Sequence, residues 1–166
     1  MSGPIQFVNL ALSLLTFSLV AKWYVLPRLA SAPLRVALEP LLLLHSFRHI
    51  GLMFLAGGAV QATLPATFSR PAAFGDLAAA VLAFASLLAL RRQWAGALGL
   101  VWIFNFVGVL DLVNAIGRGV MSDAAASMGA TFWIPSVVVP ALLVTHALIF
   151  ILLLRERGGA ASPAAA

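Results

Sequence analysis

The sequence predicts an all-α integral membrane protein, a bundle of five transmembrane helices. Of its 166 residues, 63% are hydrophobic and 9% are charged, whereas a soluble domain carries about 25% charged residues. The mean hydropathy is +1.07. The apolar stretches are continuous and do not alternate as the strands of a transmembrane barrel do. The lack of cysteine excludes disulfides, thiolate metal sites and cysteine nucleophiles.

Five stretches are long enough to cross a hydrocarbon core of about 30 Å, which takes roughly 20 helical residues. The expected spans are residues 5–26, 34–64, 72–90, 94–117 and 131–154. Prolines and arginines separate them, as turn formers and charges should. The first span is expected to stay in the mature chain, because no Lys or Arg precedes it and Lys22 follows it, unlike a secretory signal.

The segments outside the spans complete the predicted layout. Residues 118–130 are rich in Gly, Ser and Ala and form the longest connection, for which we expect an exposed loop. We expect residues 1–157 to be a single polytopic membrane domain and residues 158–166 to be a flexible C-terminal tail.

Basic residues near the span ends predict the orientation in a cell membrane. Seven lie on one side, against two on the other, Arg70 and Arg118. The seven are Lys22, Arg28, Arg35, Arg91, Arg92, Arg155 and Arg157. Because cytoplasmic loops carry the excess of Lys and Arg, the N-terminus is predicted outside and the C-terminus in the cytoplasm. This bias accounts for the net charge of +5 without a nucleic-acid partner.

Ionisable and amide side chains inside the spans mark the candidate site, because such groups are costly at the bilayer centre. His45, Arg48 and His49 lie three or four residues apart in the second span and are expected on one inward helical face. The other spans add further polar groups to this set: Asp76 in the third, Asn105, Asp111 and Asn114 in the fourth, and Thr145 and His146 in the fifth.

Depths follow from a rise of 1.5 Å per helical residue. Measured from the inner interface, His45 lies at about 13 Å and His146 at about 12 Å, so the two are expected to be level. Arg48 lies at about 18 Å, Asp76 at about 21 Å and Asp111 at about 25 Å. A guanidinium stays charged at that depth, so we expect Arg48 to pair with one of these two aspartates.

Three functions fit this pattern. In the first, His45, Arg48, His49, Asp76, Asn105, Asp111, Asn114 and His146 line a polar cavity that binds or conducts a small polar ligand, an ion or a proton. In the second, the protein is a membrane-embedded redox enzyme, hydrolase or isomerase. His45 and His146 would then hold a haem, or His45, His49 and His146 a divalent metal. In the third, it is an accessory structural subunit of a membrane complex.

Each polar group also has a purely structural interpretation. The histidines can be neutral and hydrogen-bonded between helices, and an Arg48–Asp pair can fix helix register. No catalytic residue is identified, because Ser46 has no G-x-S-x-G context. The expected partners are the lipid bilayer and the small ligand, with self-association into a homo-oligomer as a further option.

Overall fold

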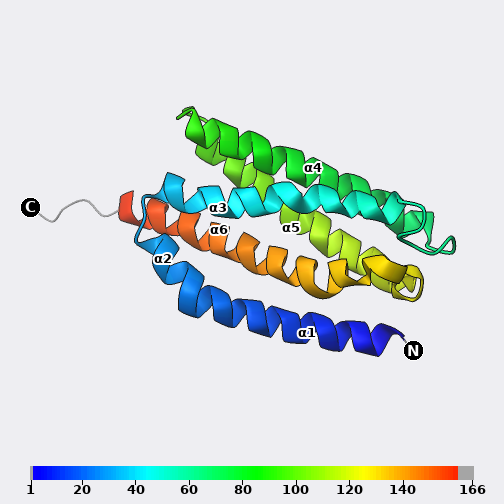
Figure 1. Cartoon of the computed structure of the whole chain (residues 1–166). Helices are drawn as coiled ribbons and strands as arrows, with labels where there is room; N and C mark the ends of the chain where they lie inside the picture. Colours follow the sequence, from blue (N-terminus) through cyan, green and yellow to red (C-terminus); the bar gives the residue numbers. More distant parts are fainter. Residues whose placement is uncertain (1, 161–166) are drawn as a thin grey trace, which may run out of the picture.

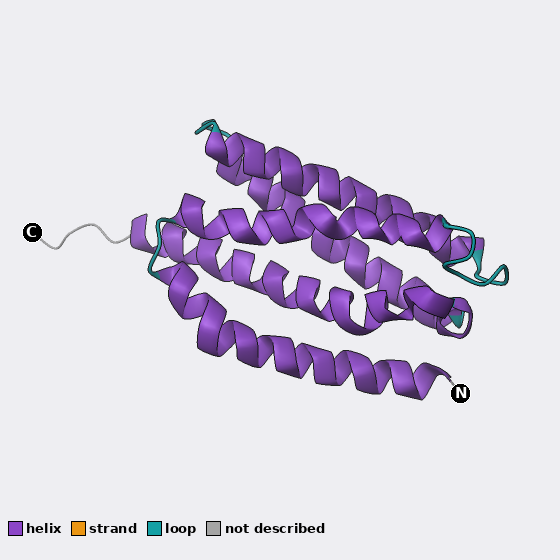
Figure 2. Ribbon diagram, viewed as in Figure 1, coloured by secondary structure: helices purple, strands orange, loops and turns teal. Residues whose placement is uncertain are grey.

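The protein is a bundle of long helices that run side by side (Figure 1). The computed structural model describes residues 2–160, of which 86% is helical with no strand in that part of the chain (Figure 2). We call each continuous helical segment a rod. The first rod consists of α1 (Ser2–Val20), the π-helical turn η1 (Ala21–Val25) and α2 (Leu26–Ala30). The second joins α3 (Leu34–Ser46) to the 3-10 helix η2 (Phe47–Leu55).

Three further rods complete the bundle. They are α4 (Ala66–Arg91), α5 (Ala97–Met121) and α6 (Val139–Ala160). Between α5 and α6 the chain forms the 3-10 turns η3 (Ala124–Ser127) and η4 (Gly129–Phe132) and the π-helical turn η5 (Ile134–Val138). Pro135 lies in η5 and Pro140 in the first turn of α6, and neither has an N–H for regular α-helical hydrogen bonding.

Four helical segments are long and apolar enough to cross a membrane: Pro4–Ala30, Ala66–Arg91, Ala97–Met121 and Gly129–Arg155. The α3–η2 rod, which contains Arg35, Glu39 and Arg48, is not one of them. It nevertheless lies along α4 and α6 for their length (Figure 1). The chain is therefore an all-helical protein with four candidate membrane spans and a fifth, more polar rod packed among them.

The rods are buried to different extents. In the most apolar 18-residue stretch of α4, 44% of the residues are buried, whereas in that of the α1–α2 rod 6% are. The α1–α2 rod lies at the edge of the bundle beside α6 (Figure 1). At the end of the bundle that holds the α4–α5 turn, a large apolar core joins α3, α4, α5 and α6. A smaller apolar cluster, which includes Phe54, Phe68 and Met128, lies at the opposite end.

Several expected boundaries differ from the structure. The second helical rod ends at Leu55 rather than at residue 64, and residues 56–65 form an irregular connection. Pro71 does not end a helix but lies inside α4, as its sixth residue. Residues 118–130 are not an open loop: α5 continues to Met121, and two short turns follow with buried Ala124 and Ala125. At the C-terminus α6 reaches Ala160, and residues 161–166 of the expected tail lie outside the described part.

Candidate functional site

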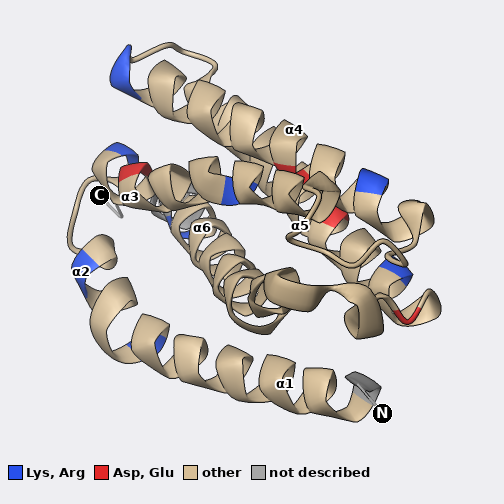
Figure 3. Ribbon diagram, turned by 45° about the vertical axis from the view of Figure 1, so that its right-hand side comes forward, with Lys and Arg blue, Asp and Glu red and all other residues tan. Residues whose placement is uncertain are grey.

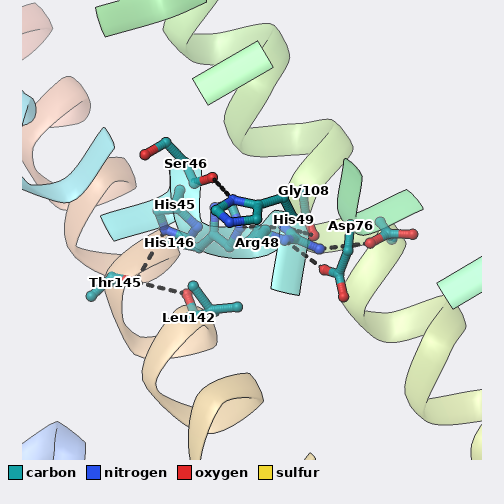
Figure 4. A network of polar contacts seen from close by, with 10 residues as sticks. His45, Ser46, Arg48, His49, Asp76, Gly108, Leu142, Thr145 and His146 are labelled. Carbon is teal, nitrogen blue, oxygen red and sulfur yellow. Dashed lines mark hydrogen bonds and ion pairs between the residues drawn. The ribbon is translucent and has the colours of Figure 1, made fainter. Parts of the chain in front are cut away.

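Arg48 is the centre of a polar cluster in the middle of the bundle (Figure 4). Its Nε donates to Asp76 Oδ1 at 2.8 Å, and its Nη2 donates to Asp111 Oδ2 at 2.6 Å. The Arg48 side chain is 1% exposed, and the two aspartates are 13% and 12% exposed. The pairing expected from the depth estimates is therefore confirmed, with both carboxylates bound to the same guanidinium rather than one.

The third guanidinium nitrogen is also occupied. Arg48 Nη1 donates to the Gly108 carbonyl oxygen at 3.1 Å and lies 3.3 Å from His146 Nε2. Every nitrogen of the guanidinium thus faces an acceptor supplied by the protein, as a buried arginine requires. Four of the five N–H donors are thereby used within the protein, so Arg48 is a poor candidate for binding an external anion.

Three glycines make the close approach of these elements possible. A Cβ on Gly51 of η2 would overlap Asp76, one on Gly75 of α4 would overlap Asp111, and one on Gly108 of α5 would overlap His146. In each case a glycine, which has no side chain, leaves the space that a polar side chain from another helix occupies. The role of these glycines depends on tertiary contacts, so the sequence alone does not predict it.

The hydrogen bonds of His146 define its protonation state. Arg48 Nη1 can only donate, so His146 Nε2 accepts. His146 Nδ1 lies 2.6 Å from Asn105 Oδ1, while Asn105 Nδ2 donates to the His146 backbone oxygen at 3.2 Å. Asn105 Oδ1 is thus the acceptor, and the proton of the imidazole is on Nδ1. His146 is a neutral imidazole fixed by two helices.

The ring of His45 contacts that of His146, with centroids 4.1 Å apart and the ring planes tilted by 42°, which confirms that the two histidines are level. Its Nε2 lies 3.1 Å from Thr145 Oγ1, which also lies 2.9 Å from the carbonyl oxygen of Ala141 and 3.0 Å from that of Leu142. Its Nδ1 is buried and has no hydrogen-bond partner in the described part of the chain.

His49 does not join this cluster, although it was expected on the same inward face. The chain changes from α-helix to 3-10 helix at Phe47, so successive side chains are about 120° apart instead of about 100°. Residues three apart then align, and Arg48, Gly51 and Phe54 are the buried residues of η2. His49 is exposed, and its Nδ1 lies 2.9 Å from the Ser46 carbonyl oxygen.

Asn114 also lies outside the cluster. It is exposed, and its Oδ1 accepts from Arg118 Nε at 3.0 Å, one turn further along α5. Glu39 of α3 binds Arg91 of α4, with Oε2 to Nη2 at 2.8 Å. Six of the eight predicted site residues are therefore brought together: His45, Arg48, Asp76, Asn105, Asp111 and His146.

The histidines do not fit the haem and metal arrangements considered from the sequence. A haem would have to lie between His45 and His146, but their rings are in direct contact, and both ring nitrogens of His146 have protein partners. In the described residues, no three His, Cys, Asp or Glu side chains are placed to hold a metal ion. The exposed position of His49 separates it from the other two histidines.

A pocket leads from the cluster toward the end of the bundle that holds the N-terminus. Residues of α1, η2, α4, α5 and η5 line it, and its two polar members are Gln6 and Asp76. Its apolar members include Phe54, Phe68, Leu112, Ala115, Ile116 and Met128. The rim residues Phe7 and Val120 are 52% and 49% exposed. Asp76 is thus the carboxylate of the Arg48 cluster that lines this pocket, which the sequence alone did not predict.

Comparison with protein families assigns this chain to a family. A family model matches residues 5–154, which include every helix that contributes to the cluster. The chain belongs to the family described as "Domain of unknown function (DUF8737)". Comparisons with curated proteins and with solved structures found no match.

Proposed function

We propose that this protein is a multi-pass membrane protein that binds a proton or a small cation at the carboxylates of Asp76 and Asp111. One observation supports this proposal most directly: two carboxylates share a single guanidinium inside the bundle. With both aspartates ionised, the group made of Arg48, Asp76 and Asp111 carries a net charge of −1. The neutral His146 adds nothing to this balance.

An unbalanced charge inside a membrane-embedded bundle is costly. The cluster reaches neutrality by taking up one positive charge, and a carboxylate oxygen is the acceptor for it. Asp76 accepts a hydrogen bond from Arg48 with Oδ1, so Oδ2 remains to bind a proton or cation. The Asp76 side chain also lines the pocket. A proton or cation that enters the pocket therefore meets a carboxylate of the cluster first at Asp76.

The orientation with the N-terminus outside is part of this proposal. Figure 3 supports it, because basic residues gather at the end that holds the α2–α3 and α4–α5 connections. In that orientation the pocket opens toward the outer half of the membrane. A cysteine at Ser122 should react with an impermeant reagent added outside whole cells, and one at Gln93 should not. The reverse pattern would overturn the orientation.

Infrared difference spectroscopy of the purified protein tests the site itself. Titration across the pH range in which the protein stays folded should show the carbonyl stretch of a protonated carboxylic acid, and Asp76→Asn should remove it. The titratable or charged groups around Asp76 are Arg48 from η2, Asp111 from α5, His146 from α6 and His45 from α3. Asp123→Asn, a substitution in the loop before η3, is the control and should keep the signal.

Two results would contradict the proposal. The first is a wild-type protein with no protonated carboxyl signal at any such pH and no cation-dependent change in stability. The second is a signal that persists in both Asp76→Asn and Asp111→Asn. Either result would favour the structural interpretation, in which Arg48 and the aspartates only fix the register of the helices.

A further inference from the structure

The pocket beside Asp76 combines apolar walls with one carboxylate. It lies between α1 and α5, and its wall is made of aromatic and aliphatic side chains except for Gln6 and Asp76. Ligand sites in proteins commonly have this composition, a mostly apolar lining with a few polar groups that orient the ligand. The side chains at the rim, Phe7 and Val120, face outward from the bundle, so the entrance is on the side that lipids would contact.

We propose that this pocket binds an amphiphilic monocation, an alkylammonium ion whose nitrogen reaches Asp76 and whose chain lies along α5. This inference rests on the proposed cation-binding function and names the class of ligand. The negative net charge of the Arg48 cluster selects a cation over an anion. The apolar walls select a cation with an aliphatic body over a hydrated inorganic ion, because such an ion would lose its water without replacement ligands.

The dimensions of the pocket favour a single unbranched chain. The cavity is narrow, with a volume of about 40 Å³ for the centres of water-sized molecules. An alkyl chain is only slightly thicker than a water molecule, so it can occupy such a channel. From Leu112 to Val120, α5 rises about 12 Å, which is close to the length of a ten-carbon chain.

The wall formed by α1 gives the pocket a route for entry. The α1–α2 rod is the least buried of the four candidate spans, and its Gln6 and Phe7 form one side of the pocket. The opposite wall includes Ile134 and Pro135 of the π-helical turn η5. Single π-helical turns are often found at functional sites. A ligand dissolved in the bilayer can therefore reach the pocket between α1 and the helices behind it.

Binding of decylammonium and of decan-1-ol to the protein in lipid nanodiscs tests the proposal. Both probes have the same chain and enter the same bilayer, but only the amine carries a charge. Thermal unfolding at a series of probe concentrations gives an apparent affinity for each. The amine should bind at least about tenfold more tightly, because a hydrogen bond to a charged group contributes more than 1.4 kcal/mol.

Two variants locate the effect. Asp76→Asn should remove the preference for the amine. Ala115→Leu, which fills the pocket and leaves the Arg48 cluster intact, should weaken binding of both probes. Gly99→Leu is the matched control on α5, since no atom lies within 4 Å of a Cβ at that position, and it should bind like the wild type.

The outcomes separate this inference from the proposed function. Equal binding of amine and alcohol, both lost in Ala115→Leu, would show that the pocket holds an uncharged lipid chain and would overturn the proposal. Amine binding unchanged in Ala115→Leu would overturn it as well. In either case, a protonated carboxyl signal that depends on Asp76 would leave the proposed function standing, whereas its absence would remove both.

Discussion

The two halves of the bundle are filled differently. In the half that holds the α4–α5 turn, side chains from four helices leave no exposed surface in the core: Leu38, Leu42, Val101 and Ile149 are each 0% exposed. In the half that holds the N-terminus, called the hollow half below, a smaller apolar cluster borders the pocket. On one side of this pocket the wall is formed by α1, which packs lightly against the bundle. The Arg48 cluster lies where these two halves meet.

This difference shows how a polar cluster in a membrane protein can be sealed on one side and open on the other. His45 and His146 contact Phe104 on the filled side, with ring centroids 5.2 and 5.4 Å from it. Asp76 borders the pocket in the hollow half. Exchange between Asp76 and its surroundings is therefore expected through this pocket rather than past Phe104.

The largest contrast is expected in chemical accessibility. The chain has no cysteine, so single introduced ones report without background. A small neutral thiol reagent should label Ala115→Cys, at the pocket, to completion. It should leave Ala97→Cys unlabelled, because Ala97 is 0% exposed in the filled half of the same helix. Equal labelling of the two would show that the halves do not differ, and labelling is measured by mass spectrometry.

Next in size is the loss of the guanidinium. Arg48→Leu leaves two buried carboxylates without a partner, and we expect the free energy of unfolding to fall by about 3 to 5 kcal/mol. Thermal unfolding in mild detergent measures this. The triple variant with Asp76→Asn and Asp111→Asn should recover part of the loss. A triple variant no more stable than Arg48→Leu alone would argue against the ion-pair network.

A smaller loss is expected from Gly108→Ala. The added Cβ would overlap the ring of His146 and lie 3.0 Å from Arg48 Nη1, so both side chains must shift. Overpacking of this kind costs about 1 to 3 kcal/mol. Gly99→Ala on the same helix has open space around its Cβ and should be neutral or slightly stabilising. If the two alanine variants unfold at the same temperature, the cluster is not packed as closely as described.

The smallest effect is expected at His49. This side chain is exposed and bonds only to the backbone of Ser46 in the described structure, so His49→Ala should change the free energy of unfolding by less than about 0.5 kcal/mol. His146→Ala should cost more, since it leaves the buried Oδ1 of Asn105 without its donor. If His49→Ala lowered the free energy of unfolding as much as His146→Ala, His49 would have to be part of the buried Arg48 cluster.

Depth along the helices could be predicted from the sequence because straight helices share one rise per residue. That constant was sufficient to place Arg48 beside Asp76 and Asp111, and His45 beside His146. The rotational position of a side chain is harder to predict, because it depends on the type of helix. The change to a 3-10 helix at Phe47 moved His49 away from the face that α-helical spacing assigned to it.

Other parts of the site depended on contacts that the sequence alone did not indicate. Gly51, Gly75 and Gly108 acquire their role only when another helix passes over them. The pocket exists because α1 packs loosely, which its uniformly apolar sequence does not indicate. The Asn114–Arg118 pair, by contrast, has the spacing of four residues that places side chains together on a helix, so the sequence could have revealed it.

The 3-10 form of η2 couples the length of this rod to its rotation. A 3-10 helix rises about 2.0 Å per residue and an α-helix 1.5 Å, so the nine residues of η2 would shorten by about 4.5 Å if they became α-helical. Over the six residues from Arg48 to Phe54, the same change would turn Phe54 by about 120° out of line with Arg48. Translation and rotation are thus coupled in this segment: a displacement of residues 56–65 toward Arg48 would accompany the change to α-helix and would rotate Phe54 of the pocket wall relative to the ion pairs of Arg48.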